Sequence, residues 1–313
     1  MSDNSSSTKI GSFSKAWLHP KYWATWMGLA TLGLIAWLPW ALQKSIAHLV
    51  SGLLYHLARR RKVITDTNVR HCFPERSEKE QKKLVRDIFY ENVLGLFETG
   101  MTFFRSYRML QANVTIEPEG QRQLQAAVLE GKGVLLIGAH YSTLDLGGVL
   151  FSFFFPVDVL YRPHNNPIFN AFLITARSRW ANQVIPHQSM KKIVRAIRQG
   201  HIFWFPADQD YGLKHSVYAP FFGLQAATIT TPQRLNKLTQ SPVFMLGHHR
   251  VGQTQQYQLN LRPIEGFPFE DDVAAATAVN QAIETEIRRY PAQYMWVHRR
   301  FKNQPDGRDL YSA

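Results

Sequence analysis

The stretch GKGVLLIGAHYSTLD, residues 131–145, decides the fold of this 313-residue chain. Its apolar run 133–138 predicts a short buried strand, and His140 follows that strand almost directly. The runs VDVLYR (157–162), HIFWFP (201–206) and PVFMLG (242–247) predict further buried strands. Helical patterns lie between them, near residues 144–155, 168–180, 190–199 and 231–238. This alternation predicts an α/β domain with a central, mostly parallel mixed sheet flanked by helices.

Two other segments extend this domain. Residues 257–262 alternate polar and apolar side chains, which predicts an edge strand with one solvated face. Ser77 and Glu80 form a capping-box pattern, and apolar residues then recur at helical spacing up to Phe104. We therefore expect a long helix over residues 78–104.

The N-terminal region carries an uncharged apolar stretch. Residues 22–43 contain no charged side chain, and a bilayer-spanning helix needs about 20 mostly apolar residues. Trp23, Trp26, Trp37 and Trp40 lie toward its two ends, where indole rings favour the headgroup level. The stretch predicts a transmembrane anchor that Pro39 ends or kinks. A cleaved signal peptide and a buried core helix are the alternatives.

A second helix is predicted after this anchor. Apolar residues recur at helical spacing from Ile46 to Leu57, and a basic cluster at residues 59–62 follows at once. This pattern is typical of an amphipathic helix over residues 44–65 at an anionic membrane surface, or of a helix packed on the domain. The predicted organisation is a tail (1–21), the anchor (22–43), this helix (44–65) and one α/β domain (66–313). More basic residues follow the anchor than precede it, which places the domain in the cytoplasm.

The overall charge predicts an anionic partner. Lys and Arg outnumber Asp and Glu by 36 to 23, and the formal net charge is +13. The single cysteine, Cys72, excludes an intrachain disulfide and a Cys-based zinc cluster. We find no phosphate loop, dinucleotide fingerprint, Gly-x-Ser-x-Gly elbow or nucleic-acid-binding motif.

His140 and Asp145 are the candidate catalytic pair. Sites in open α/β sheets collect where strands end and helices begin, and His140 lies at such a place. If a helix starts just after His140, the Asp145 carboxylate reaches imidazole Nδ1 and leaves Nε2 free to accept a proton. His140 would then deprotonate an alcohol that attacks an acyl thioester. The alternative is a structural histidine at a strand end.

Further polar residues follow the predicted strands. Arg162 is a candidate phosphate ligand, or else a partner in a surface salt bridge. Asp208 and Asp210 would position a sugar head group or hold basic side chains, or simply form a polar turn. Arg299 and Arg300 would bind phosphate at the membrane surface, or form a solvated basic face.

Two other groups of residues suggest weaker hypotheses. The sequence His248, His249, Arg250 raises the possibility of a metal site, but adjacent histidines rarely bind one ion together, and no ligand-spaced Cys or acidic residue lies near them. We interpret these residues as structural or as head-group contacts, and we predict no metal site. The aromatic run 150–155 either lines an acyl-chain tunnel or belongs to the core.

The chain also resembles a known family. The pattern His140, four residues, Asp145 is similar to that of lysophospholipid and glycerol-phosphate acyltransferases, and its surroundings resemble the late lipid A acyltransferases of Gram-negative bacteria. The matching segments run almost end to end: LHPKYW (18–23), HCFPE (71–75), LFETGM (96–101), LYRPHNNP (160–167), ADQDYG (207–212), SVYAPFFG (216–223), AAT (226–228) and QYMWVHRRFK (293–302).

The resemblance implies transfer of a fatty acyl chain from acyl carrier protein to a hydroxyl of an acyl chain on a lipid A precursor, at the cytoplasmic face of the bacterial inner membrane. It also implies no cofactor, no metal and no covalent acyl-enzyme. Acidic carrier protein and lipid phosphates would both suit the positive charge. Two departures are the sequence Pro-His-Gln-Ser at 186–189, where many relatives carry charges, and Asp at position 145, where many carry Glu.

Two other functions compete with this one. A glycerophospholipid acyltransferase that uses acyl-CoA would share the catalytic pair, but the RPHNNP and MWVHRRFK segments do not support it. A basic membrane-binding protein without enzymatic activity is the alternative from a different class.

Overall fold

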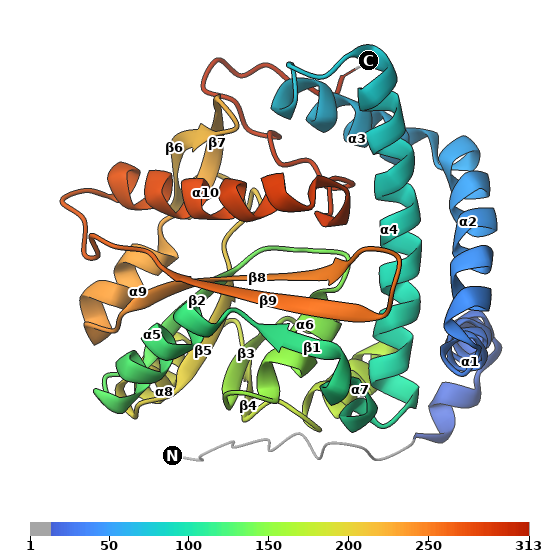
Figure 1. The fold of residues 1–313 in the computed structure, drawn as a ribbon, viewed down its shortest axis with the longest axis horizontal. Coiled ribbons are helices and arrows are strands. Elements are labelled where there is room, and N and C mark those ends of the chain that lie inside the picture. Colours follow the sequence, from blue (N-terminus) through green and yellow to red (C-terminus); the bar gives the residue numbers. More distant parts are fainter. Residues whose placement is uncertain (1–13, 313) are drawn as a thin grey trace.

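The computed structural model describes residues 14–312, and its centre is a seven-stranded sheet in the order β1-β9-β8-β2-β5-β3-β4 (Figure 1). All neighbouring strands are parallel except β8 and β9, so the predicted mostly parallel mixed sheet is confirmed. The strands are β1 (Val114–Ile116), β2 (Val134–Gly138), β3 (Val157–Tyr161), β4 (Gln183–Pro186), β5 (Ile202–Pro206), β8 (Val243–Val251) and β9 (Gln256–Pro263).

The expected edge strand is in the interior of the sheet. β9 pairs with β8 on one side and with β1 on the other, and Tyr257, Leu259 and Leu261 are buried. Residues 114–116, too short to show a pattern, form the edge instead. The prediction was wrong because a polar residue in an alternating strand was taken to face solvent, whereas Asn260 is buried and donates to Glu286.

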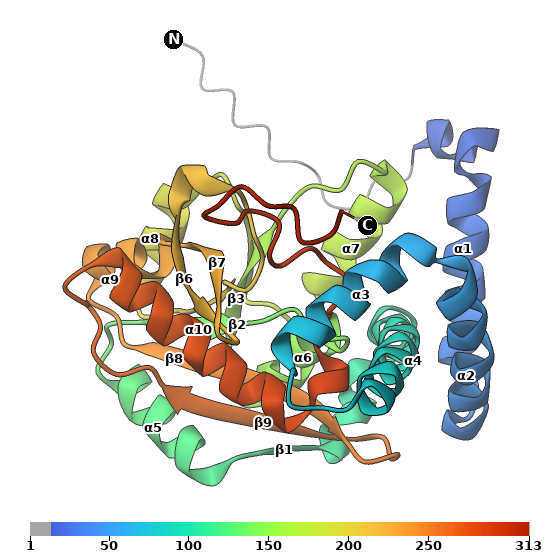
Figure 2. The ribbon, with the colours of Figure 1, turned by 90° about the horizontal axis from the view of Figure 1, so that it is seen from above.

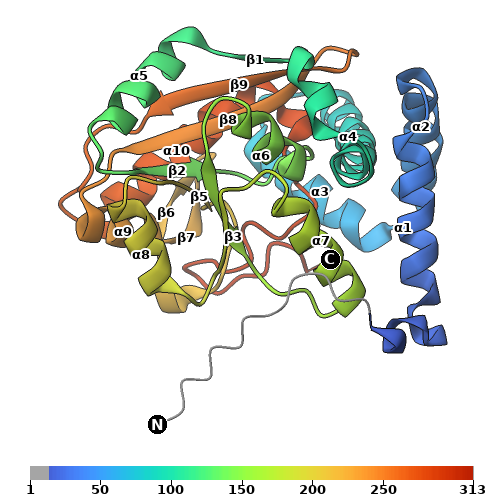
Figure 3. The ribbon, with the colours of Figure 1, turned by 90° about the horizontal axis from the view of Figure 1, so that it is seen from below.

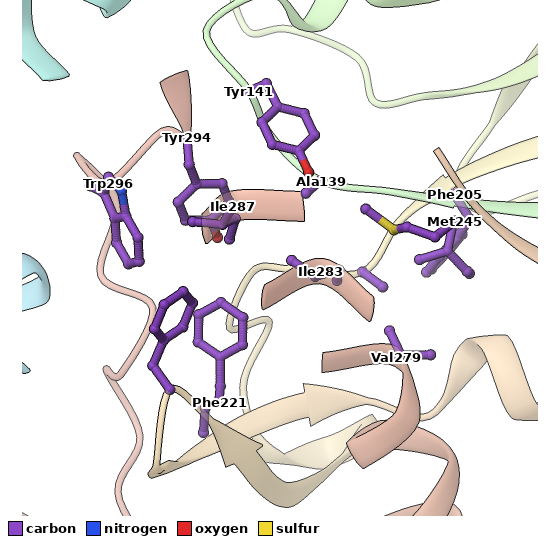
Figure 4. Packing of buried hydrophobic residues seen from close by; sticks show 14 of the residues in the cluster. Ala139, Tyr141, Phe205, Phe221, Met245, Val279, Ile283, Ile287, Tyr294 and Trp296 are labelled. Atoms are coloured by element: carbon purple, nitrogen blue, oxygen red, sulfur yellow. The ribbon is translucent and has the colours of Figure 1, made fainter. Parts of the chain in front are cut away.

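Helices cover both faces of the sheet, so the protein has two cores, one on each face. Alternate side chains of β2 point into one core or the other. Leu135 and Ile137 join the larger core with α8, α9, α10, the start of α4 and the hairpin β6–β7, part of which Figure 4 shows. Val134 and Leu136 join the core under α5 and α6. These elements are α4 (Glu78–Phe104), α5 (Pro118–Leu129), α6 (Leu144–Ser152), α7 (Pro167–Arg177), α8 (Met190–Arg198), α9 (Thr231–Thr239), α10 (Asp272–Arg289), β6 (Ser216–Phe221) and β7 (Leu224–Ile229).

The long helix α4 has the predicted bounds and the predicted capping box. The Ser77 hydroxyl accepts from the Glu80 backbone N–H, and the Glu80 carboxylate accepts from the Ser77 N–H at 2.8 Å. Gly95 lets this helix approach the loop that carries His140, because a Cβ at Gly95 would lie 2.2 Å from the Ser142 carbonyl oxygen. α4 is therefore a wall of the region after β2.

The predicted transmembrane anchor does not form as a single helix, and the structure does not support it. In place of one helix over 22–43, the chain forms α1 (Trp23–Ala36), a break at residues 37–39, and α2 (Trp40–Leu57). Pro39 ends the first helix, as its missing N–H and its ring require. At 1.5 Å per residue α1 is about 21 Å long, against about 30 Å of bilayer hydrocarbon. Within residues 14–312 we find no helix with both the length and the apolar character to cross a bilayer.

α1 and α2 both pack on α4, on the side away from the sheet (Figures 2 and 3). In Figure 1 α2 runs alongside α4 while α1 is seen end-on, so the two helices lie at a steep angle to each other. The basic cluster does not continue α2, since α2 ends at Leu57 and α3 (Arg59–Cys72) begins with Arg59. Asn68 of α3 donates to the carbonyls of Trp296 and His298, at 2.7 and 2.9 Å. The expected helix over 44–65 is thus two helices, and the second packs on the C-terminal loop. Of the predicted tail, residues 1–13 lie outside the described part of the chain.

Candidate active site

His140 lies just beyond the carboxyl end of β2, and Asp208 holds it there. β2 and β5 are parallel neighbours with Gly138 opposite Pro206, so the residues that follow the two strands meet. Asp208 Oδ1 lies 2.7 Å from His140 Nδ1, and Asp208 Oδ2 accepts the His140 backbone N–H at 3.0 Å. A carboxylate on Nδ1 selects the tautomer with its proton on Nδ1, which leaves Nε2 as a proton acceptor.

The Asp208 carboxylate is fully buried and ionised. Burial by itself raises the pKa of this carboxyl, but the charge and hydrogen bonds of His140 more than offset that effect and hold the pKa well below its ordinary value. Tyr294 donates a third hydrogen bond, from its hydroxyl to Oδ2 at 2.9 Å. Asp208 is therefore a fixed negative charge behind the imidazole, able to stabilise an imidazolium.

The C-terminal loop forms the back wall of this site. Met295 donates its backbone N–H to the His140 carbonyl at 2.9 Å, and Ser142 donates to the Gln293 carbonyl at 2.7 Å. His298 Nε2 lies 3.4 Å from the Tyr294 hydroxyl, and burial lowers the pKa of His298 to about 4, so this imidazole is neutral at pH 7. The His140 carbonyl and the Ser142 N–H are thus both fixed by residues that lie about 150 positions later in the sequence.

Asp145 does not contact Nδ1 of His140, contrary to the expected geometry. The helix starts later than assumed: residues 141–143 form a turn, α6 begins at Leu144, and Thr143 Oγ1 lies 2.9 Å from His248 Nδ1. Asp145 in the first turn of α6 accepts from Arg177 Nε at 2.7 Å instead. Arg177 ends α7, so this ion pair ties α7 to the start of α6.

A small apolar cavity of about 30 Å³ lies beside this ion pair, between α6, α7 and the sheet. Asp145 and Arg177 are at its polar side, and Phe151, Trp180 and Trp204 contribute to its apolar wall. Phe151 comes from the aromatic run 150–155. That run therefore contributes to the cavity wall through Phe151, and to the core through Phe151 and Phe155.

Arg162 and Asp210 have different surroundings. Arg162 is exposed after β3, and both its charge and that of Asp208 act on the Tyr211 hydroxyl. Tyr211 is about half exposed, and partial burial of its hydroxyl together with the charge of Asp208 raises its pKa, which Arg162 opposes. Arg162 therefore belongs to the same sheet edge as Asp208. Asp210 instead accepts from Asn303, N–H at 2.9 Å and Nδ2 at 2.7 Å, so it anchors the C-terminal loop.

Arg300 does not bind a ligand at the surface, and that expectation was wrong. Its side chain is fully buried and donates to the Ala227 carbonyl at 2.7 Å, to Thr228 Oγ1 at 3.0 Å and to Asn280 Oδ1 at 3.2 Å. It therefore joins the C-terminal loop to β7 and α10. Arg299 pairs with Asp309 and lies over the Tyr311 ring.

His248, His249 and Arg250 are buried, in line with the structural interpretation. His248 contacts the Thr143 hydroxyl, and burial lowers its pKa to about 3, which keeps the ring neutral. Arg250 forms ion pairs with Glu91 and Glu98 of α4. These residues hold the strand end of β8 against α4 and the turn after His140.

Sequence reasoning found His140 and the strand end but missed three members of the site. Arg177 is the last residue of a helix and belongs to no motif, while Tyr294 and His298 lie in a segment where only Arg299 and Arg300 were candidates. Asp208 was a candidate, but as a contact for a sugar head group or for basic side chains and not as the partner of His140. The available signal was its position two residues after β5, since the ends of parallel neighbours meet at one edge.

Comparison with known proteins shows the family of the chain. The family described as bacterial lipid A biosynthesis acyltransferase matches residues 10–303. The chain is 35% identical to lipid A biosynthesis lauroyltransferase of Escherichia coli K12 over 303 residues, 96% of this chain and 98% of the relative. It is 34% identical to the palmitoleoyltransferase of the same strain (94% and 96% covered) and 26% identical to the myristoyltransferase (96% and 96%). The chain therefore belongs to the bacterial lipid A biosynthesis acyltransferase family, and it is an O-acyltransferase.

Proposed function

We propose that this enzyme transfers a fatty acyl chain from acyl carrier protein to a hydroxyl of an acyl chain on a lipid A precursor, with His140 as the general base. The observation that carries the proposal is the His140–Asp208 pair at the end of β2. Its geometry leaves Nε2 as the proton acceptor at the open end of the sheet.

The reaction then needs no covalent intermediate on the enzyme. His140 Nε2 takes the proton of the acceptor hydroxyl as the oxygen attacks the thioester carbonyl carbon. The tetrahedral intermediate collapses with cleavage of the carbon–sulfur bond, and the imidazolium returns the proton to the leaving thiolate. Asp208 stabilises the imidazolium throughout. General-base help of this kind contributes about 10² to 10⁴ in rate.

Asp145 acts through Arg177 in this proposal. The ion pair fixes Arg177 by its Nε, and within residues 14–312 the terminal nitrogens of this guanidinium have no hydrogen-bond partner. Such preorganised donors suit the oxyanion of a tetrahedral intermediate or a phosphate oxygen. Asp145 is then a positioning residue.

The anionic substrates account for the positive charge of the chain. Acyl carrier protein is acidic and the lipid A precursor carries phosphates, so both are attracted to a protein with a net charge of +13. Arg162, exposed on the same sheet edge as Asp208, is the proposed phosphate contact. Arg299 is a second candidate, because its side chain is partly exposed.

Helices α1 and α2 would dock the enzyme on the cytoplasmic face of the inner membrane. Large apolar side chains on these two helices are exposed, among them Trp23, Met27, Leu34, Leu49 and Leu57. Exposed apolar faces of this kind mark membrane or protein contacts. The anionic membrane surface would then attract the basic cluster at residues 59–62.

The test is a transfer assay with the purified enzyme, an underacylated lipid A precursor and acyl carrier protein loaded with laurate or myristate. We expect acyl gain by the precursor with the wild type and loss of that gain with His140→Ala. Transfer by His140→Ala at the wild-type rate would refute the role of His140. Transfer only to lysophosphatidate, or only from acyl-CoA, would refute the assigned acceptor or donor.

A further inference from the structure

Helices α2 and α4 lie side by side at the outer edge of the molecule (Figures 1 and 2). Residues of both helices line a groove of about 440 Å³. We call it the α2–α4 groove, and the residues that line it include His48, Tyr55, His56, Lys83, Arg86 and Tyr90. It is separate from the site around His140, because α4 stands between the groove and the sheet.

Two cations converge on one aromatic ring of this groove. Arg86 lies over the Tyr55 ring at 5.6 Å and Lys62, from α3, at 4.2 Å. Neither forms an ion pair with a carboxylate of residues 14–312. Like charges at one ring repel each other, and an anion between them would offset that repulsion.

The carboxylates of the groove already have partners. Asp87 accepts from Lys83 at 2.6 Å, and Glu91 pairs with the buried Arg250. Neither therefore pairs with Arg86 or Lys62. Asp66 of α3 interacts with Lys62 through its charge but forms no ion pair with it, so the positive charge of the groove is only partly offset.

Tyr90 provides an unused hydrogen-bonding group on the wall of the groove. It is 7% exposed, and its hydroxyl is buried with no hydrogen-bond partner within residues 14–312. His48 stacks on its ring at 4.1 Å. A buried hydroxyl without a partner is costly, and a ligand oxygen would satisfy it.

An apolar strip of α2 borders these polar groups. Leu49, Leu53 and Leu57 are 77%, 58% and 68% exposed and lie on one face of the helix, at spacings of four residues. His48 and His56 each precede one of these leucines, so the polar and apolar strips are neighbours along α2. A ligand with an anionic head and apolar tails fits this pairing.

We propose that the α2–α4 groove binds the phosphate headgroup of an anionic glycerophospholipid, with Arg86 and Lys62 on the phosphate oxygens and the acyl tails along Leu49, Leu53 and Leu57. The Tyr90 hydroxyl donates to the headgroup. This site rests on the proposed membrane docking of α1–α2 and adds a specific lipid contact to it. It would fix how the docked enzyme is oriented on the bilayer.

The test uses dihexanoyl-phosphatidylglycerol below its micelle concentration, so that headgroup binding is measured without a membrane. By calorimetry the wild type binds saturably, and the double variant Arg86→Gln, Lys62→Gln binds about tenfold more weakly. Lys191→Gln, an exposed cation on α8, is the matched control and binds like the wild type. Arg86→Lys keeps the charge and retains most of the affinity.

Three results would overturn the proposal: no saturable binding to the wild type, equal losses in the double variant and in Lys191→Gln, or inorganic phosphate that competes as well as the lipid does. Tyr90→Phe separates a binding role from a structural one, since it should weaken lipid binding without lowering the melting temperature of the lipid-free protein. Leu49→Ser with Leu53→Ser in a vesicle-binding assay tests membrane docking separately. Vesicle binding unchanged in that variant would refute the docking and leave the short-chain lipid result standing.

Discussion

Replacing Asp208 with Asn should remove the base while keeping the shape of the site. Asp208 Oδ2 accepts two donors, the His140 backbone N–H and the Tyr294 hydroxyl, and Oδ1 accepts only His140 Nδ1–H. The single carbonyl oxygen of Asn occupies the position of Oδ2, where it accepts both donors, so the Asn amide nitrogen faces His140 Nδ1. Nδ1 must then become an acceptor, which moves the ring proton to Nε2.

With a proton on Nε2, His140 has no site for the proton of the acceptor hydroxyl. We expect kcat for acyl transfer to fall by about 10² to 10⁴, which is the range of general-base catalysis. That range corresponds to about 3 to 5 kcal/mol of transition-state stabilisation. KM should change little, because the backbone hydrogen bond and the packing of His140 remain.

The assay is steady-state acyl transfer, with ¹⁵N chemical shifts of the histidine rings as a direct readout of the tautomer. Asp210→Asn is the matched control: it makes the same change two residues away, where the carboxylate binds Asn303 and not His140. It should lower stability with little effect on kcat. A kcat for Asp208→Asn within tenfold of the wild type, with the altered tautomer seen by NMR, would refute the reasoning.

The remaining predictions concern stability. The pKa of Asp208 is held below its ordinary value of 3.8, so its stabilising contribution is complete above about pH 4 and is lost as the pH falls further. Asp208→Asn should therefore reduce the fall of the melting temperature at acidic pH; an unchanged fall would contradict this. A Cβ at Gly148 would lie 2.3 Å from the Trp180 ring, so Gly148→Ala should displace that ring and lower the melting temperature; an unchanged melting temperature would contradict this packing. Arg300→Met should lower the free energy of unfolding, measured by urea titration, by about 3 kcal/mol, because it leaves buried acceptors without donors. Arg299→Gln should lower it by less than about 1 kcal/mol. Similar losses in the two variants would count against the buried role of Arg300.

Several parts of the fold could be predicted because their causes are local. The capping box and the 3.6-residue apolar period gave the bounds of α4, and short apolar runs gave β2, β3, β5 and the start of β8. The edge strand β1 could not be predicted in this way because it has only three residues, and the strands of the β6–β7 hairpin could not because proline or polar residues interrupt the apolar runs of SVYAPF and LQAATI. The single helix expected over 22–43 is absent because apolar content was counted over the whole stretch, whereas Pro39 divides that length between two helices.

The sequence by itself determined that His140 lies at the end of a buried strand, that helices and strands alternate, and that the chain resembles lipid A acyltransferases. Only the tertiary structure decided which carboxylate serves His140. Asp145 is five residues away and pairs with Arg177, while Asp208 is 68 residues away and reaches Nδ1. The reason is that strand neighbourhood is set by the packing of the whole sheet: β5 lies beside β2, and their ends bring Asp208 and His140 together.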